Sequence, residues 1–134
     1  MVFGTFDLLH PGHLSFLRQA KALGDFLIVS IARDANVKSI KGAAPLLREN
    51  DRRKLIANLA MVNKTVLGDK RGYLRHVLRQ KPDIIALGYD QAAYVAQLKK
   101  DIAAGRLHAK IVRLKPHHPN RYKSALYKKL ISKN

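Results

Sequence analysis

The sequence predicts an α/β fold in which five parallel strands form one sheet, with helices on both faces as a three-layer sandwich. Three observations predict it. Short apolar runs alternate strictly with amphipathic segments, glycine or proline ends several of them, and no repeat or low-complexity segment interrupts the 134 residues. Strict alternation favours parallel strands joined by helical crossovers. A chain of this length is expected to fold as a single domain, residues 1–134.

In the first third of the chain, two apolar runs flank one amphipathic segment. Residues 1–3 are expected to form a short strand, and residues 14–23 a helix with leucine and alanine on one face. Gly24 ends that helix. The run 26–32 is long enough for a buried parallel strand, and residues 38–45, which carry glycine and lysine, are expected to form a loop.

The middle of the chain continues the alternation. Asn50 or Asp51 is expected to cap a helix that runs to about residue 60. A third strand is predicted over 64–67, and a helix over 73–80 is ended by the proline that follows it.

The last third repeats the pattern. A fourth strand is predicted over 84–87 and is closed by a glycine, and a helix over 94–104 is also stopped by a glycine. The fifth strand spans 110–114. Ser124 is expected to cap a final helix that runs to about residue 132.

Charge is the strongest compositional feature. Lys and Arg number 26 against 9 Asp and Glu, a net charge of +17, and after Asp101 there is no acidic residue while nine Lys or Arg follow. Such a field attracts polyanions. The positive charge is consistent with binding to nucleotides, nucleic acids or acidic membranes. It is also consistent with a basic surface that is only solvated, so charge alone does not identify a partner.

Several classes are excluded by what the composition lacks. No apolar run approaches about 18 residues, so no transmembrane helix is expected, and no signal peptide is visible. The chain has no cysteine. That excludes disulfides, thiolate metal sites and a catalytic cysteine, and it is consistent with a cytoplasmic protein.

One decapeptide carries the functional signal. Residues 4–13 read Gly-Thr-Phe-Asp-Leu-Leu-His-Pro-Gly-His and join the first strand to the first helix. Backbone N–H groups at a helix N-terminus favour an anion, and His10 and His13 can hydrogen-bond the same anion. Pro11 suits the first turn of the helix, and Gly12 permits close approach. Metal binding by the pair is not expected, because no cysteine or nearby carboxylate completes a site.

Three informative segments follow strands and should meet at the carboxyl edge of the sheet. They are residues 4–13, 33–45 and 88–91. Ligands of parallel α/β sheets bind at this edge. The first strand is not followed by G-x-G-x-x-G, and the chain has no G-x-x-x-x-G-K-[ST], which argues against a dinucleotide site and a P-loop NTPase.

The signature resembles that of a known family. Gly4-Thr5-Phe6-Asp7 followed by His10-Pro11-Gly12-His13 is similar to the motif of the cytidylyltransferase-like nucleotidyltransferases, which include glycerol-3-phosphate cytidylyltransferases and archaeal-type FAD synthases. The resemblance extends over nearly the whole chain. It implies a Rossmann-like sandwich and an enzyme that transfers a nucleoside monophosphate from a triphosphate to a phosphorylated acceptor, with release of pyrophosphate.

The resemblance also implies roles for individual residues. His10 and His13 would contact the triphosphate and stabilise the transition state, and Lys41 would reach the phosphates, whereas Lys38 is better explained as a surface lysine. Asp7 would orient the signature, contact the metal or cap the turn. The further nucleotide-binding residues implied are Gly4, Thr5, Phe6, Arg53, Gly88, Asp90, Arg121 and Ser124. The segment around Ser124 departs from the Ser/Thr-rich motif of the family, and the pair His117-His118 is expected to be solvated.

The resemblance favours one reaction among several. Asp90-Gln91 after the fourth strand looks more like archaeal-type FAD synthases, so FMN adenylyltransferase activity with ATP and FMN is the leading interpretation. A cytidylyltransferase using CTP and glycerol 3-phosphate, or a related sugar or polyol phosphate, is the alternative. A basic module that binds nucleic acid without catalysis is a third. A divalent ion such as Mg²⁺ would be bound through the substrate phosphates, and no protein metal ligands are expected. No membrane association is expected. The resemblance implies a homodimer.

Overall fold

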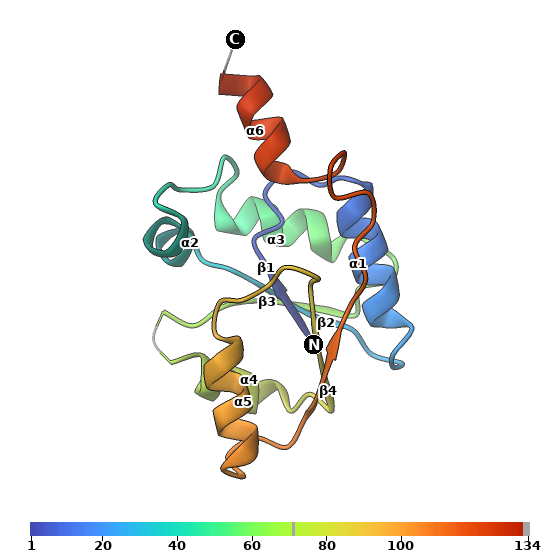
Figure 1. Cartoon of the computed structure of the whole chain (residues 1–134), viewed down its shortest axis with the longest axis vertical. Helices are drawn as coiled ribbons and strands as arrows, with labels where there is room; N and C mark the ends of the chain where they lie inside the picture. The colour runs from blue at the N-terminus through green and yellow to red at the C-terminus, as the bar shows by residue number, and fades with distance from the viewer. Residues whose placement is uncertain (71, 133–134) are drawn as a thin grey trace.

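The computed structural model describes residues 1–70 and 72–132 and has an α/β fold in which parallel strands lie among helices (Figure 1). The strands are β1 (Val2–Gly4), β2 (Ile28–Ile31), β3 (Lys64–Leu67), β4 (Ile84–Leu87) and β5 (Lys110–Arg113). The helices are α1 (Pro11–Lys21), α2 (Asp34–Lys41), α3 (Glu49–Ala57), α4 (Tyr73–Gln80), α5 (Val95–Ala103) and α6 (Ser124–Ser132).

The strands form two parallel sheets rather than the single five-stranded sheet that was expected. β1, β2 and β3 pair in that order, and β4 pairs with β5. The two sheets adjoin at Met1, whose ammonium donates to the Ile84 carbonyl at 2.8 Å and whose carbonyl accepts from the Ala86 N–H at 3.0 Å. Because this contact involves one residue just before β1, it does not extend into a continuous ladder. All paired strands are parallel, as predicted.

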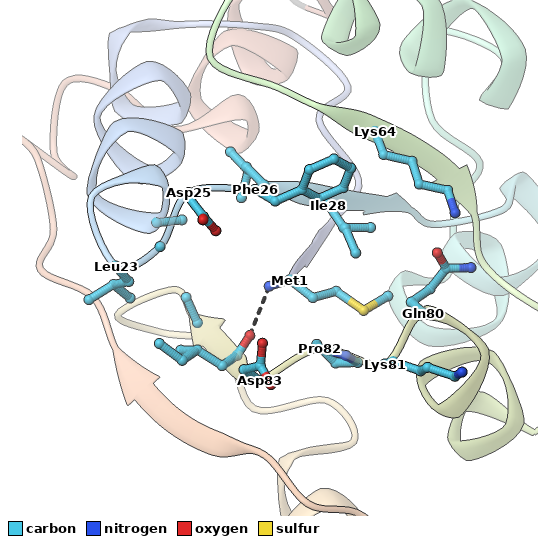
Figure 2. Close-up of a pocket in the computed structure, with 15 residues that line it drawn as sticks. Met1, Leu23, Asp25, Phe26, Ile28, Lys64, Gln80, Lys81, Pro82 and Asp83 are labelled. Atoms are coloured by element: carbon cyan, nitrogen blue, oxygen red, sulfur yellow. Dashed lines mark hydrogen bonds between the residues drawn. The ribbon is translucent and has the colours of Figure 1, made fainter.

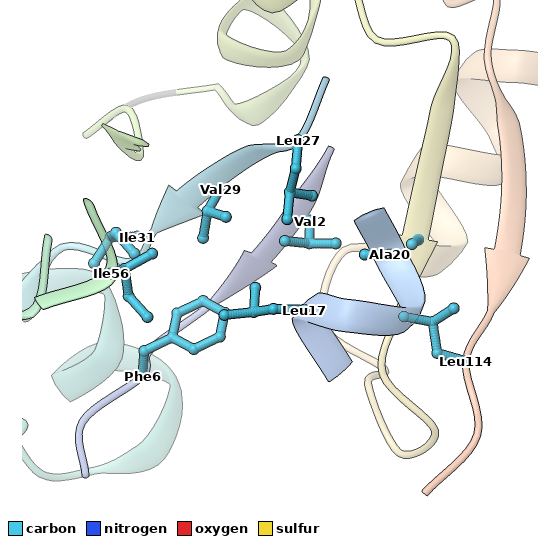
Figure 3. Packing of buried hydrophobic residues seen from close by; sticks show 10 residues of the cluster. Val2, Phe6, Leu17, Ala20, Leu27, Val29, Ile31, Ile56 and Leu114 are labelled. Atoms are coloured by element: carbon cyan, nitrogen blue, oxygen red, sulfur yellow. The ribbon is translucent and has the colours of Figure 1, made fainter. Parts of the chain in front are cut away.

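Helices cover both faces of the strands, which confirms the layered arrangement. One core lies beneath α1 and α3, where Leu17 and Ile56 pack against Val2, Val29 and Ile31 (Figure 3). The other core lies beneath α4 and α5 and contains Val77, Ile85, Leu87, Val95 and Leu98. Side chains alternate along a strand, so Ser30, between Val29 and Ile31, faces α4 and α5.

The region expected to be a loop over 38–45 is mostly helical. α2 spans Asp34–Lys41, and only residues 42–48 form the connection to α3. Asp34 lies in the first turn, lysines occupy the last turn, and Gly42 ends the helix with a φ of 83°. These charges suit the helix dipole, and glycine tolerates the left-handed conformation. The loop prediction was therefore wrong for residues 38–41.

The other elements form where they were predicted. β3, α4 and β4 have the predicted bounds, and the remaining ends differ by up to three residues. No helix in residues 1–70 and 72–132 is long and apolar enough to cross a bilayer.

A small cavity of about 310 Å³ lies at the amino edge of the strands, opposite the segments singled out by sequence (Figure 2). Ile28 and Lys64 at the strand starts line it, together with Met1 just before β1 and Gln80 at the end of α4. The Gln80 side-chain carbonyl oxygen is buried and has no hydrogen-bond partner among the described residues.

Candidate active site

Two histidines form the start of α1. His10 is the N-cap residue, and its Nδ1 accepts from the Gly12 N–H at 3.1 Å, while Nδ1 of His13 accepts from the His10 N–H at 3.3 Å. This is a reciprocal capping box, with imidazoles in place of the usual serine and glutamate. The two rings stack with centroids 3.8 Å apart. Since each Nδ1 accepts a hydrogen bond, each neutral ring must carry its proton on Nε2, where it can be donated to an anion.

Both rings are neutral at pH 7. Burial, followed by charge repulsion from His10 and Lys41, lowers the pKa of His13 to about 4. Burial also lowers the pKa of His10. Neutral imidazoles with these tautomers can donate hydrogen bonds from Nε2 to an anion.

The shape of the turn before the histidines depends on Phe6 and Gly4. Phe6 is 4% exposed and has a φ of 53°, a left-handed conformation uncommon for a residue with a side chain. Its ring folds back over Gly4, where an added Cβ would lie 2.5 Å from a ring carbon. The same ring lies 5.4 Å from that of His13. Gly4 therefore allows the chain to turn tightly enough for Phe6 to pack beside His13.

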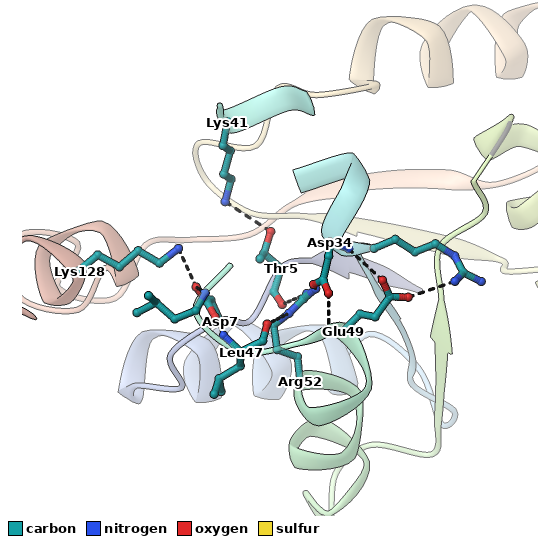
Figure 4. A network of polar contacts seen from close by, with 10 residues as sticks. Thr5, Asp7, Asp34, Lys41, Leu47, Glu49, Arg52 and Lys128 are labelled. Carbon is teal, nitrogen blue, oxygen red and sulfur yellow. Dashed lines mark hydrogen bonds and ion pairs between the residues drawn. The ribbon is translucent and has the colours of Figure 1, made fainter. Parts of the chain in front are cut away.

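Asp7 ties the signature to the connection between α2 and α3 (Figure 4). Its two carboxylate oxygens accept from the N–H groups of Leu46 and Leu47, each at 2.8 Å, and one also pairs with Lys128 of α6 at 2.6 Å. Burial would raise the pKa of Asp7, but hydrogen bonds from Leu47, Lys128 and Leu46 lower it below its usual value. The geometry supports the orienting role among the three expected for Asp7, because both oxygens are already engaged.

Arg52 is a second organising residue, and its guanidinium is fully buried. It donates to the Thr5 carbonyl at 2.7 Å and the Leu47 carbonyl at 3.0 Å, and it pairs with Asp34 at 2.6 Å (Figure 4). It thus joins the end of β1 to the starts of α2 and α3. The sequence had singled out Arg53, its neighbour, which is half-buried on α3.

A cavity of about 930 Å³ opens at the carboxyl edge of the strands. It brings together most of the residues named from sequence: Gly4, Thr5, Phe6, His13, Lys41, Gly88 and Asp90. His10 stacks on His13 at its border. Lys41 reaches the same region, with Nζ 3.4 Å from the Thr5 hydroxyl, and burial and then Lys128 lower its pKa. The described lining residues do not include Arg53, Arg121 or Ser124.

A side chain at the end of β5 holds the turn that follows β4 in place. Arg113 donates to the carbonyls of Gly88 and Gln91 at 2.8 and 2.7 Å, and the Gln91 side chain accepts from the Gly88 N–H at 3.2 Å. Asp90 pairs with Lys123 at 3.4 Å, with both side chains about half exposed. The turn is therefore shaped by its backbone contacts, while the Asp90 carboxylate is open to a ligand. Arg113 could not be selected from the sequence, because its contacts join the end of β5 to the turn after β4.

The segment before α6 lies beside the signature. The Ser124 hydroxyl donates to the Leu8 carbonyl at 3.3 Å, so it fastens α6 to the signature instead of serving as the expected helix cap. The Arg121 guanidinium lies 5.4 Å from the centre of the Tyr122 ring, and that ring stacks on His117 at 5.8 Å. Tyr122 and His117 both line the cavity, so His117 is closer to the site than the sequence indicated.

Among residues 1–70 and 72–132 no group of three or more His, Asp or Glu could hold an ion. An ion held mainly by substrate phosphates would need few protein ligands.

A helix N-terminus, two imidazole donors and a lysine at the carboxyl edge of parallel strands are features of a phosphate-binding site. Residues 1–130 match the family model described as Cytidylyltransferase-like. The chain belongs to the cytidylyltransferase-like family and is a nucleotidyltransferase. This outcome confirms the predicted enzyme class, and it gives no support to the alternative of a non-catalytic nucleic-acid-binding module.

Relatives of this chain include several archaeal proteins named FAD synthase. The protein from Methanosarcina mazei is 48% identical over 83% of this chain and 72% of its own length. The protein from Thermoplasma acidophilum is 37% identical over 98% of this chain and 92% of its own length. A crystal structure titled as the lipopolysaccharide core biosynthesis protein from Thermoplasma volcanium is 40% identical, covers 87% of this chain and 95% of that chain, and superposes with a TM-score of 0.81. The last comparison shows the same Rossmann-like fold.

Proposed function

We propose that this chain is an FMN adenylyltransferase, an FAD synthase that transfers AMP from ATP to FMN. Relatives named FAD synthase match it over most of both chains. The observation that carries the proposal for this chain's own residues is the histidine capping box, which leaves two Nε2–H donors beside a large cavity. In the reaction an oxygen of the FMN phosphate bonds to the α-phosphorus of ATP, the bond to the β-phosphate bridging oxygen breaks, and pyrophosphate leaves.

The proposed roles follow from what this reaction requires. Phosphoryl transfer needs alignment and neutralised charge, not a nucleophilic side chain. His10, His13 and Lys41 would hold the triphosphate oxygens and stabilise the charge that develops on them. The backbone of Gly4, Thr5 and Phe6 and the turn at Gly88 and Asp90 would hold the nucleoside. Arg53, Arg121 and Ser124 keep their proposed nucleotide-binding roles, with less support because the described cavity lining omits them.

The cofactor and the assembly are part of the same proposal. Mg²⁺ would be held mainly by the phosphates and would neutralise their charge. The family resemblance supports a homodimer and a single domain over residues 1–134. The absence of cysteine is consistent with a cytoplasmic location.

The test is a panel of substrates. ATP or CTP is combined with FMN or glycerol 3-phosphate in the presence of Mg²⁺, and pyrophosphate release is measured together with the nucleotide product. We expect ATP with FMN to give FAD faster than any other pair. Faster turnover of CTP with glycerol 3-phosphate, or no turnover of ATP with FMN under any divalent ion, would contradict the proposal.

A further inference from the structure

A buried polar pair in the same cavity has no part in the phosphate chemistry described above. Ser30 on β2 and His76 on α4 are 3% and 5% exposed, and Oγ of Ser30 lies 2.7 Å from Nε2 of His76. Both residues line the 930 Å³ cavity. They lie on the face of the strands covered by α4 and α5, beside a cluster of buried apolar side chains.

The pair keeps unused hydrogen-bonding capacity. A serine hydroxyl has one donor and two acceptor sites, and a neutral imidazole has two ring nitrogens, so their mutual hydrogen bond occupies one site on each. Burial is the largest cause that lowers the pKa of His76, so its ring is neutral at pH 7. A buried polar group that lines a cavity is satisfied best by a ligand that supplies the complementary donor or acceptor.

The surroundings of the pair suit a flat ring system. Tyr73 lies one helical turn before His76 on α4, and its ring centre is 5.5 Å from that of Tyr94, which is 53% exposed. The Tyr73 hydroxyl donates to Asp101 at 2.8 Å, and Asp101 also accepts from Arg106 at 2.9 Å, so the Tyr73 ring is fixed. A fixed aromatic side chain beside a buried polar pair is typical of sites for flat heteroaromatic ligands.

The order of the strands indicates which substrate meets the pair. The signature, where the phosphates would react, follows β1. The turn proposed to hold the nucleoside follows β4, on one side of β1, whereas Ser30 lies on β2, on the other side. The two substrates meet at the reacting phosphorus, so the acceptor extends toward the side that the nucleoside does not occupy.

We propose that Ser30 and His76 recognise the acceptor: they hydrogen-bond the heteroatom edge of the isoalloxazine ring of FMN, and the Tyr73 ring, which packs against Tyr94, lines one face of it. This inference rests on the proposed function. It assigns the two residues to the choice of acceptor and leaves ATP binding and the phosphate chemistry to the residues already described.

The test separates FMN binding from catalysis. FMN affinity is measured by quenching of its fluorescence, without ATP, for the wild type, for Ser30→Ala and for the double variant Ser30→Ala/His76→Leu. The double variant removes both partners together, which avoids an unpaired buried group. We expect each variant to weaken FMN binding about tenfold or more. Steady-state kinetics should show a raised KM for FMN, with the KM for ATP and kcat within about threefold of the wild type.

Matched controls are Ser39→Ala and His108→Gln, which change the same residue types at exposed positions. They should leave FMN affinity unchanged. The inference is overturned if a folded double variant binds FMN like the wild type, or if its KM values for ATP and FMN rise together. If the wild type binds FMN through Ser30 but forms no FAD, the proposed function alone is rejected. If the double variant forms FAD normally at low FMN, the inference alone is rejected.

Discussion

The two edges of the same strands differ in size and in chemistry. At the carboxyl edge a cavity of about 930 Å³ is surrounded by the signature, the start of α1 and the turn after β4. At the amino edge a cavity of about 310 Å³ lies among the ends of α1 and α4 and the strand starts. Parallel strands place helix N-termini at one edge and helix C-termini at the other, so an anion is favoured only at the first.

The edges also differ in how their buried polar groups are paired. At the carboxyl edge Asp7 and Arg52 each make three polar contacts, and Ser30 pairs with His76. At the amino edge the buried Gln80 oxygen has no partner among the described residues. Substitutions at the carboxyl edge should therefore affect catalysis or stability strongly, and substitutions at the amino edge should not.

The largest effect is expected for His13→Ala. This variant loses an Nε2–H donor to the transition state, and loss of one such donor costs about 2.7–4 kcal/mol in other enzymes, or about 100–1000-fold in kcat. Pro11 and the His10 cap remain, so the helix should still form. Pyrophosphate release and circular dichroism measure the two properties. A folded variant with turnover within about tenfold of the wild type would reject the role of His13.

A large loss of stability is expected for Arg52→Met. The change leaves Asp34 and two backbone carbonyls without their buried partner, which should lower the free energy of unfolding in urea by about 3 kcal/mol. Arg53→Met is the matched control and should change it by less than about 0.5 kcal/mol. Equal losses in the two variants would show that the buried network at the carboxyl edge does not stabilise the fold.

The pH dependence of stability is expected to report on His13. Its pKa is about 4 in the folded protein and about 6.5 when unfolded, so between these values the unfolded chain binds more protons. The His13 contribution is present above pH 6.5 and is lost as pH falls toward 4, at up to about 1.4 kcal/mol per pH unit. Urea titrations from pH 7 to 4.5 should show a shallower decline for His13→Gln than for the wild type. Identical slopes would contradict the burial of this ring.

The smallest effect is expected at the amino edge. Gln80→Leu replaces a buried oxygen that has no described partner with an apolar group of similar size, so the variant should be more stable by about 1 kcal/mol. Its kcat and both KM values should equal those of the wild type. A loss of activity here would remove the contrast between the two edges.

Sequence reasoning worked best where the signal was local. β3, α4 and β4 have the predicted bounds because an apolar or amphipathic run with a glycine or proline beside it specifies each of them. The signature, the helix that it starts and the position of His13 at the cavity were predictable from ten adjacent residues. No long-range contact was needed for these inferences.

The features that sequence missed depend on contacts between distant residues. α2 has no wide apolar stripe, and its first turn is fixed by Asp34 contacting Arg52 and Glu49. Arg52 and Arg53 are neighbours in sequence, yet a helix turns about 100° per residue, so only one can face the signature. Ser30 and His76 are 46 residues apart, and only the packing of α4 on β2 brings them together.

The attachment of α6 has a consequence for biosynthesis. The Ser124 hydroxyl contacts the Leu8 carbonyl across 116 positions of the chain, and Lys128 neutralises Asp7 (Figure 4). During translation the signature leaves the ribosome long before these partners do. Until α6 docks, Asp7 therefore lacks the ammonium group that neutralises it, and only the N–H groups of Leu46 and Leu47 can hold its carboxylate.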